Sequence, residues 1–137
     1  RRFIGDELIP AIDRRYRTTD ERAIVGESLA GLFIVETFLR EPSLFTHYIA
    51  FDPSIWWNKA SLADSAAGLI ARMDSVPRSI YLTSSRDDIG AGTARIAQAL
   101  DAAHRRDLTW RFTPRPDQTH GTIFRAMAPG MLAEALR

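Results

Sequence analysis

A chain of 137 residues with 45% hydrophobic content is long enough for one globular core and too short for two comfortable domains. The formal net charge is +1, and Lys59 is the only lysine, so interspersed arginines carry nearly all the positive charge; this argues against a nucleic-acid-binding stripe and against strong capture by an anionic membrane. The lack of cysteine excludes disulfides, thiolate metal sites and a cysteine nucleophile, and no apolar stretch approaches the ~20 residues of a membrane span.

Hydrophobic periodicity predicts helices and strands in alternation. Apolar residues recur at four- and five-residue steps from Phe3 to Tyr16, which indicates an amphipathic helix with a kink or a late start at Pro10. Short apolar runs predict buried strands at 22–26, 48–51, 79–83 and 108–112, and helical spacing predicts helices at 29–39, 62–73, 93–104 and 123–136. This order predicts an α/β fold over residues 1–137, with four parallel strands covered by helices on both faces.

The pentapeptide at residues 26–30, Gly-Glu-Ser-Leu-Ala, lies between the first predicted strand and the helix after it. A sharp strand-to-helix turn can present a serine nucleophile there, provided that the residues two before and two after it are small. Gly26 and Ala30 meet that demand, and the turn would aim the N–H of Leu29 at a developing oxyanion. Ser28 is therefore the candidate nucleophile; the alternative is a helix N-cap serine.

A serine nucleophile needs a base, and the base needs an acceptor that orients it. Of the three histidines, His47 precedes a strand and His104 ends a helix beside arginines, whereas His120 follows the last predicted strand and a polar loop. His120 is the predicted base, with a loop or capping role as the alternative. The acid is expected just beyond the third strand, where Asp87 and Asp88 stand; one of them could instead cap the next helix.

These residues give the chain a resemblance to the esterase family of α/β-hydrolases that includes siderophore esterases, S-formylglutathione hydrolases and mycolyltransferases. The siderophore-esterase branch is the most similar. The resemblance covers essentially the whole chain and is carried by segments 7–13, 22–31, 53–58 and 120–121. The double tryptophan in Pro-Ser-Ile-Trp-Trp-Asn is its most specific part. It implies hydrolysis of carboxylic esters through an acyl-enzyme, with no metal or organic cofactor. It also assigns the acid to Asp88, although some relatives work with a serine–histidine pair alone. The chain departs from the family pattern at Glu27, usually histidine, and at Ala30, usually glycine.

The resemblance further implies which residues contact the substrate, a small-molecule ester. Glu27, Trp56 and Trp57 are predicted to do so, with ordinary core packing as the alternative for the tryptophans. It also implies that strands preceding the opening helix are absent from this chain, along with a second oxyanion donor. The strand at 22–26 would then have an open edge, to be covered by that missing segment or by a second copy of the chain.

Two other functions remain open from the sequence. An acyltransferase would use the same serine and histidine and would differ only in the alcohol that attacks the acyl-enzyme. An inactive hydrolase fragment could instead serve as an interaction module.

Overall fold

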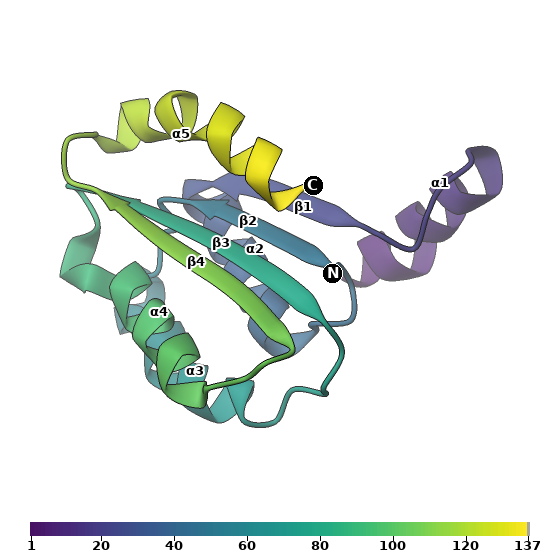
Figure 1. The fold of residues 1–137 in the computed structure, drawn as a ribbon, viewed down its shortest axis with the longest axis horizontal. Helices are drawn as coiled ribbons and strands as arrows, with labels where there is room; N and C mark the ends of the chain where they lie inside the picture. Colours follow the sequence, from purple (N-terminus) through teal and green to yellow (C-terminus); the bar gives the residue numbers. More distant parts are fainter. Residues whose placement is uncertain (137) are drawn as a thin grey trace.

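The computed structural model describes residues 1–136 and confirms the predicted α/β fold (Figure 1). Residue 137, the last of the predicted domain, lies outside the described residues. The strands are β1 (Ala23–Glu27), β2 (His47–Phe51), β3 (Arg78–Ser85) and β4 (Leu108–Arg115). The helices are η1 (Phe3–Leu8), α1 (Ile9–Arg15), α2 (Ser28–Arg40), η2 (Trp57–Ala60), α3 (Ser61–Ile70), η3 (Ile89–Ala91), α4 (Gly92–Ala103) and α5 (His120–Ala135).

The opening segment changes helix type where the sequence predicts a kink. η1 is a π-helix of six residues, and α1 begins at Ile9 with Pro10 in its first turn. Proline suits that position because its missing N–H would have no partner inside the helix. Figure 1 shows α1 beyond the amino ends of the strands and away from both faces of the sheet.

The four strands form one parallel sheet in the order β1-β2-β3-β4. All their carboxyl ends therefore meet at one edge, the edge at which α/β folds bind ligands. Within residues 1–136, β1 pairs with β2 alone and is an edge strand.

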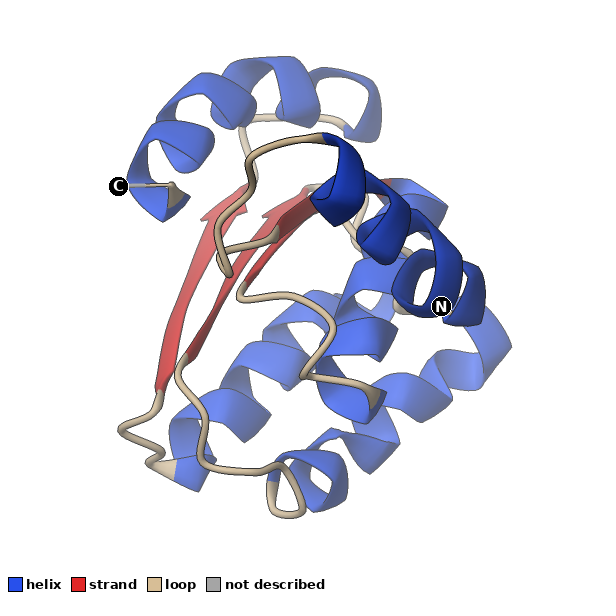
Figure 2. Ribbon diagram, turned by 90° about the vertical axis from the view of Figure 1, so that its right-hand side faces the viewer, coloured by secondary structure: helices blue, strands red, loops and turns tan. Residues whose placement is uncertain are grey.

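Helices cover the sheet on both faces (Figure 2). Alternate side chains of β2 and of β3 enter different cores. Tyr48 and Ala50 pack with α2, α3 and α4, whereas Ile49 and Phe51 pack under α5. This alternation follows from the two-residue period of a strand, and burial on both faces explains why β2 is almost continuously apolar. No helix of the described part of the chain is long and apolar enough to cross a membrane.

Candidate active site

Ser28 occupies a strained turn at the junction of β1 and α2. Its φ of 60° lies in the left-handed region, which non-glycine residues rarely adopt and which is typical of functional sites. A Cβ at Gly26 would lie 2.8 Å from Cβ of Ala30 and 3.0 Å from Cδ1 of Ile34, so that the turn closes only with glycine there. Leu29 follows in the first turn of α2, where helix N–H groups have no acceptor inside the helix.

His120 begins α5 directly after the loop that follows β4, so that it lies at the same edge of the sheet as Ser28. A reciprocal capping box between Thr119 and Thr122 fixes the start of this helix. The backbone N–H of His120 donates to Oδ2 of Asp87 at 2.8 Å. Its ring is about half exposed, and Nδ1 lies 2.6 Å from Oδ2 of Asp52.

Asp52 is the first residue after β2, and its side chain is only 4% exposed. Its φ of 43° turns the chain sharply where β2 ends. The Ser85 backbone N–H donates to Oδ1 of Asp52, and the Ser85 hydroxyl donates to Oδ2, each at 2.7 Å. The sheet register explains this contact, because Phe51 is opposite Thr83 and β3 continues for two residues beyond that point.

The structure differs here from the prediction that Asp88 orients the histidine. Among residues 1–136, no hydrogen bond joins the Asp88 carboxylate to His120, and the ring contacts Asp52 instead. Burial raises the pKa of the Asp88 carboxyl above its ordinary value, and the nearby charge of Asp52 acts in the same direction. Asp87, the alternative acid, holds His120 through the backbone. A sequence signal for Asp52 exists, because an acidic residue directly follows the second predicted strand at its carboxyl end.

Ser54 connects this loop to the candidate nucleophile. Its N–H donates to the Ser28 carbonyl at 3.0 Å, and the two hydroxyl oxygens are 3.3 Å apart. Ser54 is buried. No hydrogen bond joins Ser28 to His120 in the described part of the chain. The segment from Asp52 to Ser54 thus contacts both candidate catalytic residues.

Trp56 and Trp57 follow two and three residues after Ser54 and are 43% and 58% exposed. Their rings meet edge to face with centroids 6.1 Å apart. Core packing therefore does not account for them. The next three residues have positive φ, at 49° for Asn58, 56° for Lys59 and 58° for Ala60, so a tight left-handed turn carries the exposed Lys59. Glu27, the last residue of β1, is partly buried, and its contact with substrate stays a prediction.

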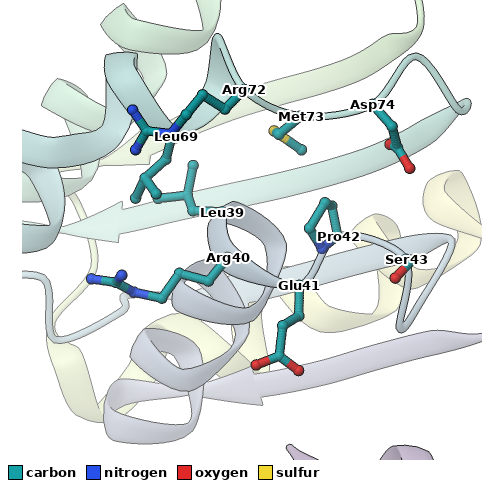
Figure 3. Close-up of a pocket in the computed structure, with 9 residues that line it drawn as sticks. All are labelled: Leu39, Arg40, Glu41, Pro42, Ser43, Leu69, Arg72, Met73 and Asp74. Atoms are coloured by element: carbon teal, nitrogen blue, oxygen red, sulfur yellow. The ribbon is translucent and has the colours of Figure 1, made fainter.

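A separate cavity of about 440 Å³ lies between the ends of α2 and α3, at the amino edge of the sheet (Figure 3). It is remote from the candidate active site, because α2 begins at Ser28 and runs away from it. Three of the charged groups that line it have partners. Arg40 pairs with Glu36 at 3.1 Å, Glu41 with Arg1 at 2.6 Å and Asp74 with Arg78 at 2.5 Å.

Comparison with known proteins identifies the family of the chain. The family model described as "Putative esterase" matches residues 1–118. The ferri-bacillibactin esterase BesA of Bacillus subtilis is 48% identical over 59 residues, which are 42% of this chain and 20% of that protein. The siderophore triacetylfusarinine C esterase of Aspergillus fumigatus is 31% identical over 70 residues, which are 50% of this chain and 24% of that protein.

Solved structures show the same fold. The BES protein of Bacillus cereus superposes with a TM-score of 0.83 at 23% identity, covering 98% of this chain and 51% of that one. The siderophore hydrolase EstA of Aspergillus nidulans gives a TM-score of 0.76 at 22% identity, covering 98% of this chain and 55% of that one. The chain therefore spans about half the length of these solved relatives. Since the family model covers most of its residues, the chain belongs to this esterase family of α/β-hydrolases.

Proposed function

We propose that the protein is a serine hydrolase that cleaves carboxylic esters through an acyl-enzyme. The observation that carries the proposal is the strained turn at Ser28, at the same sheet edge as a histidine whose ring is bonded to a buried carboxylate. A left-handed serine between a strand and a helix holds the hydroxyl out of the helix, where it can reach a substrate.

The reaction proceeds in two steps, acylation of Ser28 and hydrolysis of the acyl-enzyme. Ser28 Oγ forms a bond to the ester carbonyl carbon as its proton moves to Nε2 of His120, and the Leu29 N–H stabilises the oxyanion. The bond to the leaving alcohol then breaks, and the alcohol takes the proton from His120. In the second step, water attacks the acyl carbon and gives a proton to His120. The bond from the acyl carbon to Ser28 Oγ then breaks, His120 returns the proton to Oγ, and the carboxylic acid product leaves.

The substrate class follows from the exposed tryptophan pair and from the relatives. Trp56 and Trp57 present aromatic faces beside the loop that contacts Ser28. Such surfaces favour ligands with flat or apolar groups, which stack on them and lose contact with water. The curated relatives are esterases of siderophores. A siderophore-type ester is therefore the proposed substrate.

An organophosphonate probe tests the nucleophile directly. The protein should take up one phosphonyl group, located by peptide mass spectrometry at Ser28, because only an activated serine reacts readily with such a probe. Ser28→Ala should abolish both labelling and ester turnover. Ser65→Ala, at an exposed position on α3 with a hydroxyl bonded to the Ser61 carbonyl, is the matched control and should label normally. Modification of Ser54 or Ser84 in place of Ser28 would contradict the assignment.

A further inference from the structure

We propose that Asp52 is the positioning carboxylate of His120, which keeps the imidazole proton on Nδ1 and leaves Nε2 free to accept the proton of Ser28. This inference rests on the proposed function, because it gives the histidine of that reaction its acceptor. The proposal replaces Asp88, which follows β3, by Asp52, which follows β2. In the sheet, β2 lies next to β1, the strand that leads to Ser28.

The hydrogen bonds around Asp52 determine which partner donates. An ionised carboxylate only accepts, so every group bonded to it must supply a hydrogen. The backbone N–H of Ser85 is an obligate donor to Oδ1. The Ser85 hydroxyl oxygen accepts the N–H of Asp87 at 3.0 Å, which directs its own hydrogen to Oδ2 of Asp52. The 2.6 Å contact from the imidazole therefore carries a proton on Nδ1.

The surroundings suit a carboxylate that stabilises a developing imidazolium. The Asp52 side chain is almost fully buried, so that water screens its charge little. Three hydrogen bonds to the carboxylate replace the hydration that it loses on burial.

The position of Asp52 along the chain couples it to the nucleophile. Ser54 lies two residues further and contacts Ser28 through its backbone N–H and its hydroxyl. A Cβ placed on Gly31 of α2 would approach Cα of Pro53 to 3.0 Å, so that this loop also packs tightly on the helix that Ser28 begins. Asp88 has no such connection, since β2 separates β3 from β1.

The tautomer of His120 tests the proposal independently of activity. Nitrogen-15 NMR of the protein should show His120 protonated at Nδ1 near neutral pH, with the signal assigned by its loss in His120→Gln. In Asp52→Asn the amide can still accept the Ser85 N–H, and its NH₂ would donate to Nδ1, which moves the ring proton to Nε2. The kcat should then fall by up to roughly 10⁴-fold, the scale of loss for a wrong tautomer, with KM little changed.

Three further variants complete the design. Asp88→Asn should retain the Nδ1-protonated ring and lose much less turnover. Ser85→Ala removes a partner of Asp52 but keeps the carboxylate, so the tautomer should persist even if stability falls. Asp101→Asn, at an exposed position on α4, is the matched control and should behave as wild type. Circular dichroism establishes that each variant is folded.

The outcomes separate this inference from the proposed function. A tautomer change in Asp52→Asn alone supports the positioning role, even in a protein that hydrolyses no ester, in which case the esterase function fails. An unchanged tautomer in folded Asp52→Asn overturns the role of Asp52, whatever the activity. A change in Asp88→Asn instead would transfer the role to the acid after β3.

Discussion

At the scale of single residues, the candidate site depends on close contacts that leave no room for one added carbon. Gly26→Ala would place its Cβ 2.8 Å from Cβ of Ala30, closer than side-chain carbons pack. We expect the variant to lose about 1–3 kcal/mol of unfolding free energy, as in overpacked cores, and to lose ester turnover because the turn at Ser28 must open. Urea denaturation and an ester assay measure the two effects.

Gly68→Ala is the matched control for this substitution. Gly68 lies inside α3, and a Cβ there would meet only Nη1 of Arg72, at an ordinary 3.5 Å. Alanine should stabilise the protein there by about 0.5–1 kcal/mol, since glycine is a poor helix residue. Equal stabilities of the two variants would show that the Gly26 contact is not tight.

Two of the candidate catalytic residues are predictable from sequence, and the acid contact is not. Ser28 and His120 stand out because local patterns determine them: a strand, a small-residue turn and a helix for the serine, and the loop after the last strand for the histidine. The acceptor at Asp52 depends instead on three segments that meet in space, the ends of β2 and β3 and the start of α5. The sequence does not show that these three segments meet unless the order of the strands in the sheet is also known.

At the scale of elements, β3 and β4 are longer than apolar content alone predicts. The predicted strands end at residues 83 and 112, where polar residues begin, whereas β3 continues to Ser85 and β4 to Arg115. Ser84 and Ser85 are buried and stay in the strand because their backbones pair with β4, and the Ser85 hydroxyl bonds to Asp52. Pairing and side-chain hydrogen bonds thus maintain a strand through polar residues.

The buried phenol of Tyr48, in β2, makes the stability of the protein decrease at alkaline pH. Burial raises the pKa of Tyr48 to about 12, although its hydroxyl accepts the Phe45 N–H and donates to the Pro42 carbonyl, both at 3.1 Å. The unfolded phenol ionises first, near its ordinary pKa of about 10. The associated stability is therefore complete below pH 10 and is lost as pH rises from 10 to about 12, by at most about 3 kcal/mol.

Tyr48→Phe should flatten this alkaline slope in urea denaturation followed between pH 9 and pH 12. It should also lower stability at neutral pH by about 1–3 kcal/mol, because two partly buried backbone groups lose their partner. Tyr16, on the exposed surface, provides the comparison, and Tyr16→Phe should keep the wild-type slope. An alkaline slope that Tyr48→Phe leaves unchanged would show that a group other than Tyr48 causes the loss of stability.

At the scale of the whole molecule, the outer edge of β1, which has no partner strand within residues 1–136, is open to association. Val25 is exposed on this strand, and a sheet edge offers unpaired backbone N–H and C=O groups to another chain. We expect a chain of these 137 residues to self-associate, with an average mass that rises with concentration in light scattering. Val25→Lys should reduce the association, since a charged edge residue opposes strand pairing.

The control for this prediction is Val76→Lys, which changes a still more exposed valine in the loop before β3. It should leave the association unchanged, because Val76 is not part of the sheet edge. A monodisperse monomer over the whole concentration range would contradict the prediction.

The left-handed turn after the tryptophan pair has a practical consequence. It carries Lys59, the only lysine of the chain, two residues beyond Trp57 and exposed. Every other basic side chain is arginine or histidine, so an amine-selective fluorophore finds a single lysine ε-amino group, two residues along the chain from the exposed tryptophan pair. We expect the indole rings to quench a dye attached at Lys59. A ligand that displaces the dye from the rings would change its fluorescence, so substrate binding could be followed without modifying the Ser28 hydroxyl.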